Sequence, residues 1–424
     1  MANNFDSNFT NKLMRVFLEK FESTRVLSKN VNTQLLSNAF NPSTGDTVFF
    51  KRPTDYTSFR NATGDLTAST ASDIITGKAS GVVQDYITVH VDYDEADEAI
   101  KMDQLDQLLA PMATRISTDL ELDFAAFMMK NSGLLAGAPG TSVTTWDHVA
   151  EAGAMMSASG IPMDDQWNYA VNPFTQTKLA SDQRSLGAGG VAGDDINRAN
   201  RMAVINEDFA GMRVMKANTL ASFTTPATGD TAGVVGVIDI TYATAKDTMT
   251  QTIAVTGFGA FAGVIKAGTV VQVTGRNRLN MSTRQPIIDD TGANRLFTAV
   301  VTADSAAFVA GAGTLVVSGP GIFEASGAYN TTDTAIIATD VITILNADST
   351  LFQPNLFWHK QAFSIGSVPI KKLHSTDTLG TTEDGLQIRI SKGSDFTKNS
   401  QQVRFDLRPS FAVLNPFFAG QSFG

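Results

Sequence analysis

The stretch 101–132 constrains the fold most, because its apolar residues recur at steps of three or four, the repeat of one helical face. Pro111 interrupts the pattern, so it either kinks one long helix or begins a second helix after a short break. About 30 helical residues at roughly 1.5 Å each exceed a typical globular helix. The sequence therefore predicts a long spine helix to which sheets and loops attach. Its apolar residues are Met102, Leu105, Leu108, Leu109, Met112, Ile116, Leu120, Phe124, Phe127 and Met128.

The N-terminal stretch 8–39 has apolar residues at helical spacing and is predicted to be helical. Lys12, Arg15 and Lys20 make it locally basic in an acidic chain. Such a face is a solvated helix surface, a docking surface for an acidic partner, or an arm lying on a neighbouring subunit.

Two predicted strands, 45–52 and 86–93, flank about 30 residues with few apolar side chains. A compact domain rarely carries so long a loop unless the loop is functional. The simplest arrangement is an extended two-stranded arm. Because such an arm is marginal by itself, we expect it to rest on another chain.

The middle of the chain divides by composition. Residues 141–222 alternate predicted helices and strands and form a mixed α/β unit. Residues 224–350 are rich in Thr, Val, Ala and Gly and show no convincing helix, which predicts an inserted barrel or sandwich. Strands return from residue 355 and are expected to complete the interrupted sheets. The strands predicted for the insertion are 234–241, 252–256, 269–274, 296–302, 314–318 and 341–345.

Charge and cysteine content exclude several classes of protein. The 424 residues carry a net charge of −10, which disfavours a general nucleic-acid binder. Cysteine is absent, so disulfides and thiol chemistry are excluded. Only 17% of residues are charged, which suits a surface hidden in an assembly or simply a chain rich in Ala, Gly, Thr and Ser. The N-terminus resembles no secretion signal, and no apolar run is long enough to predict a membrane span.

No constellation of residues predicts catalysis. The four histidines form no metal-binding spacing, and both a nucleophile elbow and a phosphate-binding loop are absent. The adjacent carboxylates Asp289 and Asp290 lie in a predicted turn, where solvation is more common than metal binding. We therefore predict a protein without enzymatic activity, cofactor or metal.

Several blocks of sequence, spread over both ends of the chain, resemble the coat proteins of short-tailed lambdoid phages. The inserted domain matches them only in character. The resemblance implies an α+β, Hong Kong 97-type capsid fold with a long spine helix, an extended E-loop and an inserted all-β barrel. The blocks are STGDTVFFKRP (43–53), ATGDL (62–66), ITGKASGVVQDYITVHVDY (75–93), EAIKMDQLDQLLAP (98–111), TDLELDFAAFMMKN (118–131), PNLFWHKQAFSIGSVPIKKLHS (354–375) and VRFDL (403–407).

The same resemblance implies a division into five parts. These are an N-arm (1–40), an E-loop (41–90), a peripheral domain with the spine helix (91–140 and 376–424), an axial domain (141–223 and 351–375) and the barrel (224–350). The family implies a major capsid protein of the virion, built from pentamers and hexamers on a lattice commonly of T=7 type. It further implies assembly in the host cytoplasm around a scaffolding protein and a portal, and expansion of this procapsid as double-stranded DNA is enclosed without sequence-specific binding.

Two groups of charged residues are candidate contact sites. Lys12, Arg15 and Lys20 are candidates for scaffold binding or for the N-arm contact. A second group is expected on an exposed loop of the barrel domain between capsomers, where opposite charges suit symmetric pairing. The second group comprises Arg276, Arg278, Arg284, Asp289, Asp290 and Arg295.

The alternative function is a β-rich phage adhesin or carbohydrate-binding surface protein, although residues 224–350 contain no Trp for sugar stacking. A hydrolase is disfavoured because the sequence contains no candidate catalytic triad.

Overall fold

The predicted spine helix is present in the computed structural model as α3 (Leu105–Lys130), a helix of 26 residues that contains Pro111. It buries one stripe, which includes Ile116, Leu120 and Phe124. The chain forms two compact units, and α3 contributes residues to both. The structure describes residues 5–33, 47–51, 58–69, 78–94, 105–186, 199, 201–205, 208–228, 232–238, 249–324, 329–368, 370–374, 377–395 and 400–424.

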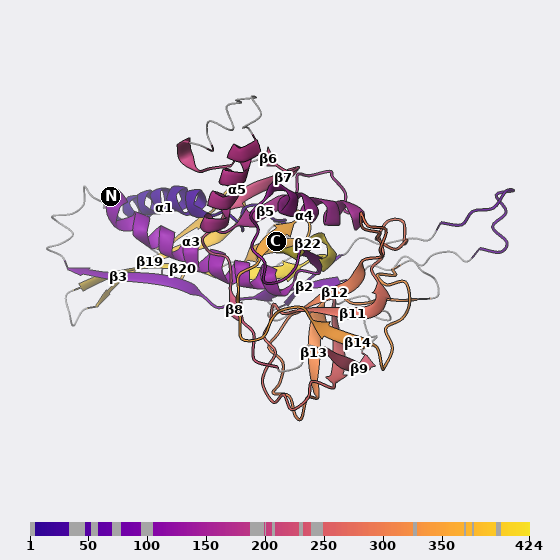
Figure 1. The fold of residues 1–424 in the computed structure, drawn as a ribbon. Coiled ribbons are helices and arrows are strands. Elements are labelled where there is room, and N and C mark those ends of the chain that lie inside the picture. Colours follow the sequence, from indigo (N-terminus) through magenta and orange to yellow (C-terminus); the bar gives the residue numbers. More distant parts are fainter. Residues whose placement is uncertain are drawn as a thin grey trace. The chain divides into compact units, whose positions relative to one another are not determined.

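The first unit comprises residues 1–48, 80–125 and 363–412. Its N-terminal helix, α1 (Phe5–Thr24), packs on a four-stranded antiparallel sheet (Figure 1). The contact includes Phe17, whose ring stacks on that of Phe405 with ring centres 4.6 Å apart. The strands of this sheet, in spatial order, are β18 (Thr378–Thr381), β19 (Gln387–Asp395), β20 (Ser400–Leu407) and β3 (Ile87–Asp94).

A second sheet follows the order β1-β2-β21-β17. β2 pairs antiparallel with β21, with Val82 opposite Phe411. The sequence predicted no strand at the position of β2, because its alternation is broken by Ser80 and Gly81. Residues 52–57 and 70–77 of the predicted E-loop lie outside the described residues. The strands are β1 (Thr47–Lys51), β2 (Lys78–Val83), β21 (Pro409–Val413) and β17 (Phe363–Ser367).

The second unit comprises residues 49–79, 126–362 and 413–424. Its central sheet, of order β4-β22-β16-β5-β7-β6, carries α4 (Trp146–Ala158) and α5 (Pro173–Leu186). Its core contains Tyr169, Leu179 and Phe357. Thr145 is the N-cap residue of α4, and its side chain makes no cap hydrogen bond. The strands are β4 (Leu134–Ala136), β22 (Ala419–Ser422), β16 (Asn355–Trp358), β5 (Asn168–Val171), β7 (Met212–Lys216) and β6 (Asp208–Phe209), with the 3₁₀ helix η5 (Pro416–Phe418) before β22.

The inserted segment forms a closed six-stranded barrel, which confirms the predicted all-β barrel (Figure 1). Alternating apolar residues face inward, including Ile253, Val255 and Leu315. β8 (Phe223–Thr224) and β15 (Leu351–Phe352) pair where the chain enters and leaves the barrel. In spatial order the strands are β10 (Thr250–Thr256), β13 (Gly313–Ser318), β12 (Leu296–Val301), β11 (Val270–Asn277), β14 (Val341–Ile344) and β9 (Ala232–Ile238).

Candidate assembly surfaces

α1 is shorter than the sequence predicted. The helix ends at Thr24 rather than extending to residue 39, and residues 34–39 lie outside the described residues. The hydroxyls of Ser23 and Thr24 both donate to the carbonyl of Lys20, at 2.8 and 3.2 Å, and such local bonds compete with helix continuation. Of the candidate basic residues, Arg15 and Lys20 are exposed on α1; Lys12 belongs to the helix, but its side chain is not described.

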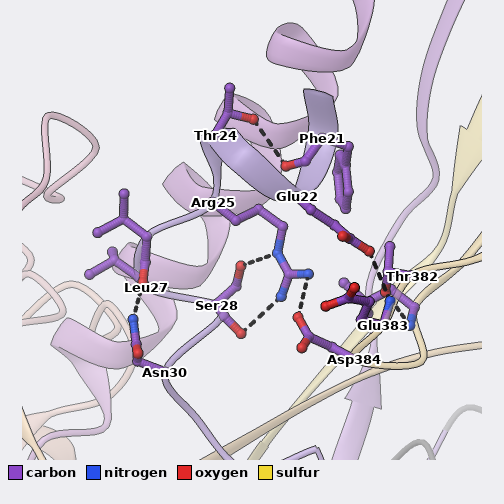
Figure 2. Close-up of polar contacts among 12 residues, drawn as sticks. Phe21, Glu22, Thr24, Arg25, Leu27, Ser28, Asn30, Thr382, Glu383 and Asp384 are labelled. Atoms are coloured by element: carbon purple, nitrogen blue, oxygen red, sulfur yellow. Dashed lines mark hydrogen bonds and ion pairs between the residues drawn. The ribbon is translucent and has the colours of Figure 1, made fainter. Parts of the chain in front are cut away.

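The chain turns sharply after α1, at an elbow formed by residues 25–31. The Arg25 guanidinium donates to the Ser28 hydroxyl at 2.7 Å, to the Ser28 carbonyl at 3.0 Å and to Asp384 Oδ2 at 2.8 Å (Figure 2). The Arg25 side chain is fully buried, whereas Asp384 is 22% exposed. The carboxylate of Glu22 accepts from the backbone N–H of Glu383 at 2.8 Å. These contacts tie the elbow to the turn that precedes β19.

Glu121 of α3 supports the elbow from within the same unit. Its carboxylate accepts from the backbone N–H groups of Leu27 at 2.7 Å and Ser28 at 3.0 Å, and also from the Ser28 hydroxyl. Glu121 is only 2% exposed. A buried carboxylate is stable when several donors surround it, so this group serves as a backbone clamp.

We expect Glu121→Gln to loosen the elbow and to lower the free energy of unfolding by about 1–3 kcal/mol, because an amide NH₂ would face a buried backbone N–H. Hydrogen exchange at the Leu27 and Ser28 amides should accelerate. The matched control is Glu22→Gln, whose amide oxygen can still accept from Glu383. Unchanged exchange in Glu121→Gln would show that the carboxylate does not hold the elbow.

The candidate barrel residues do not form one exposed charged loop. Arg278 is 3% exposed, so its expected place on a solvent-facing loop is wrong. It donates to the carbonyls of Gly133 and Thr298, at 2.7 and 2.6 Å. Its guanidinium lies 5.5 Å from the Phe297 ring centre and 5.6 Å from that of Phe417. Burial lowers the pKa of Arg278 to about 10.

The other arginines of the group also bind within the chain. Arg276 forms a two-pronged pair with Asp340, with bonds of 2.7 and 2.6 Å. Arg284 donates to the carbonyl of Asn330 at 2.7 Å. Arg295 donates to Glu151 at 3.1 Å. Short-range pairing of these cations inside the subunit leaves less charge for contacts with other copies.

The turn at residues 288–294 is the exposed part of the group. Asp289 accepts from Thr291 and Ala293. Hydrogen bonds to Asp289, the largest from the Thr291 hydroxyl, lower its pKa. Asp290 is exposed beside Ile288, which is 63% exposed. The exposed Asp290 side chain gives this turn a negative charge in solvent. A contact between this turn and another capsomer stays a prediction.

Sequence reasoning missed the buried polar groups. Asp406 of β20 accepts from Arg389 at 3.1 and 2.5 Å, from Arg404 at 2.6 Å and from Thr88 at 2.7 Å, and it is fully buried. The alternation of Arg404, Phe405 and Asp406 along β20 indicates a strand, but it does not tell which charged side chain is covered. Only the pairing of β20 with β3 and β19 brings Thr88 and Arg389 to Asp406.

The described residues contain no group of three or more His, Asp or Glu side chains arranged to hold a metal ion. No described helix is both long and apolar enough to cross a membrane. His359 is fully buried and bonds Asp164 at 2.9 Å, while its Nδ1 accepts from the backbone of Gln361 at 3.2 Å. These contacts give His359 a structural role within the subunit.

A long helix shared by two units, paired sheets and an inserted barrel are the architecture that the sequence resemblance implied for a capsid subunit. The chain belongs to the P22 coat protein family, because the family model described as "P22 coat protein - gene protein 5" matches residues 1–424. It is 36% identical over 430 residues to a major capsid protein of Acyrthosiphon pisum secondary endosymbiont phage 1, covering 100% of both chains. The predicted Hong Kong 97-type capsid fold is thereby confirmed.

Two chains of solved phage structures are similar to this chain. A chain of Mycobacterium phage Che8 is 12% identical with a TM-score of 0.45, covering 94% of this chain and 90% of that one. A chain from the capsid of Ralstonia phage GP4 is 8% identical with a TM-score of 0.43, covering 95% of this chain and 90% of that one. Membership of the P22 coat protein family and the likeness to a major capsid protein make this chain a major capsid protein, which self-associates into the phage head and is structural rather than enzymatic.

Proposed function

We propose that this capsid protein forms pentamers and hexamers of an icosahedral head of T=7 type, first as a procapsid around a scaffolding protein and a portal. The procapsid then expands while double-stranded DNA is enclosed. Family membership over all 424 residues is the observation that carries this proposal. The net charge of −10 agrees with a wall that does not adhere to the enclosed polymer.

Electron microscopy of the purified protein, expressed with and without its scaffolding protein, tests this proposal. We expect uniform closed shells with the scaffolding protein, and irregular or spiral particles without it. Persistent monomers in both preparations would contradict the proposal. Shells of the same size in both preparations would show that assembly does not require the scaffolding protein. Comparing shells before and after DNA packaging tests expansion, which an unchanged diameter would exclude.

The basic face of α1 is the proposed contact with the scaffolding protein. Replacing Lys12, Arg15 and Lys20 together by Gln should weaken co-sedimentation with that protein at least several-fold, because three cations that supply electrostatic attraction are removed. The control is Lys266→Gln, which neutralises an exposed cation of the barrel. Fewer shells with undiminished scaffold binding would instead place α1 against neighbouring capsid subunits.

A further inference from the structure

A basic turn, defined here as Lys371, Lys372, Leu373 and His374, stands out on the surface of the first unit. All four residues are exposed, and Leu373 is 61% exposed. The two adjacent lysines give this turn a positive charge in a chain with ten more acidic than basic residues. An apolar centre with a polar rim is one feature of protein–protein contacts.

Two buried side chains hold the backbone of this basic turn. Asp377 is 2% exposed, and its Oδ2 accepts from the backbone N–H groups of Leu373 at 2.6 Å and His374 at 3.0 Å. Arg389, 5% exposed, donates to the carbonyl of Lys371 at 2.8 Å. The turn is therefore fixed while its side chains stay in solvent. A preorganised surface binds with a smaller entropic cost than a loop that must be ordered on contact.

Asp377 is anchored in turn by the adjacent sheet. Its Oδ1 accepts from the Ser391 hydroxyl of β19 at 2.8 Å. Burial alone would raise the pKa of Asp377, but bonds from His374, Ser391 and Leu373 outweigh burial and lower it. The carboxylate therefore stays ionised and keeps the basic turn in place near neutral pH.

The same unit carries a surface of opposite charge, the acidic face, defined as Asp85, Tyr86, Asp119, Leu122 and Asp123. Leu122 and Tyr86 are 43% and 48% exposed. Arg115 pairs with Asp119 at 3.1 Å, and both lie on the spine helix. Partial burial, followed by the negative charges of Asp119 and Asp85, raises the pKa of Asp123. Like charges gathered beside exposed apolar groups favour a cationic partner.

We propose that the basic turn of one copy docks on the acidic face of a second copy, head to tail, as the contact that closes capsomer rings. The match is one of charge: two lysines and a leucine meet a leucine, a tyrosine and the carboxylates of Asp85 and Asp123, beside an Asp119 that already pairs with Arg115. This inference rests on the proposed assembly into rings. Leu373 and Leu122 are both exposed in the single subunit, so both are accessible to a second copy.

Two different patches on one unit make a heterologous contact. Repeating such a contact generates a ring when the rotation closes, whereas an identical patch on each partner gives only a dimer. Both patches belong to the first unit. The angle between successive subunits is then set within one compact body, which suits a capsomer.

The absence of cysteine permits a direct test. Leu122→Cys and Leu373→Cys are combined, shells are assembled and oxidised, and the products are separated without reducing agent. A disulfide forms when Cα atoms lie within about 7 Å, so we expect a ladder that extends beyond dimers. Each single variant should stay monomeric. The matched control joins Leu122→Cys to Leu351→Cys, another exposed leucine, and should give no ladder.

The outcomes separate this inference from the proposed function. If the double variant assembles into intact shells but yields only monomers after oxidation, the proposed contact is overturned. Dimers without larger products would overturn the ring. Failure of the unaltered chain to form shells would instead count against the proposed assembly itself.

Charge exchange supplies a second measurement. Lys371→Glu with Lys372→Glu should lower the shell yield at least tenfold, and so should Asp119→Lys with Asp123→Lys. Joining all four changes should restore shells, because attraction is rebuilt with reversed sign. Circular dichroism shows whether each variant is folded. The docking would be contradicted if the folded double variants still form shells at the normal yield. It would also be contradicted if the folded fourfold variant forms no more shells than the double variants.

Discussion

Asp406→Asn is expected to lower the free energy of unfolding of the unassembled subunit by about 3–5 kcal/mol, the usual cost of removing one partner from a buried ion pair. The carboxylate is fully buried, and it accepts from the guanidinium groups of Arg389 and Arg404. Asparagine keeps the volume but loses the charge, so the Arg389 cation would stay buried without a counter-charge. Chemical denaturation followed by circular dichroism measures the change.

The matched control is Arg404→Ala, which removes the partner whose side chain is 45% exposed. This variant should lower the free energy of unfolding by about 1 kcal/mol or less, because water solvates exposed charges and makes their ion pairs weak. A loss as small for Asp406→Asn as for this control would show that the buried pair does not stabilise the unit.

Acid should abolish the contribution of Asp406. Burial works to raise its pKa, but hydrogen bonds from Thr88, Arg404 and Arg389 outweigh burial and lower the pKa. A depressed folded-state pKa stabilises the fold above the unfolded pKa of about 3.9, and this stabilisation disappears as the pH falls through the folded value. The difference between the original chain and Asp406→Asn should therefore shrink from about pH 5 downwards. A constant difference would exclude linkage to this carboxylate.

Periodicity predicted the elements whose burial follows a simple repeat. The spine helix and the six barrel strands lie close to their expected positions, because alternation or a three-to-four spacing directly encodes a covered face. β2 escaped detection because Ser80 and Gly81 carry no apolar signal, and its place is set by pairing with β21. The end of α1 depends on local hydroxyl bonds that hydrophobic spacing does not report.

The burial of charged side chains was the feature of the structure that the sequence predicted least well. Glu121 follows Leu120 on α3 and reads as a solvated residue, yet the elbow after α1 covers it. Its partners are more than 90 residues away in sequence, so no local pattern can reveal them. The same holds for Arg278, which looks like part of a charged loop but contacts Gly133 and Phe417. Long-range packing, rather than residue type, decides which charges are available for assembly.

Arg278→Glu is expected to destabilise the second unit by about 3–5 kcal/mol, enough to reduce the yield of folded subunit. A carboxylate would be buried opposite the carbonyl oxygens of Gly133 and Thr298, where both partners are acceptors. It would also lie against the Phe297 and Phe417 rings, whose negative faces favour a cation. Thermal unfolding of the unassembled protein measures this loss.

Asp290→Arg is the matched charge reversal on the exposed turn of the same domain. Because Asp290 lies in solvent, the stability of the subunit should change by no more than about 0.5 kcal/mol. If the turn contacts another capsomer, shell yield should fall while the subunit stays folded. If Arg278→Glu subunits are stable but fail to assemble, Arg278 itself contacts another capsomer and its burial is contradicted. If Asp290→Arg forms normal shells, the turn does not contact another capsomer. The two variants therefore separate a residue that stabilises the barrel from one that acts between copies.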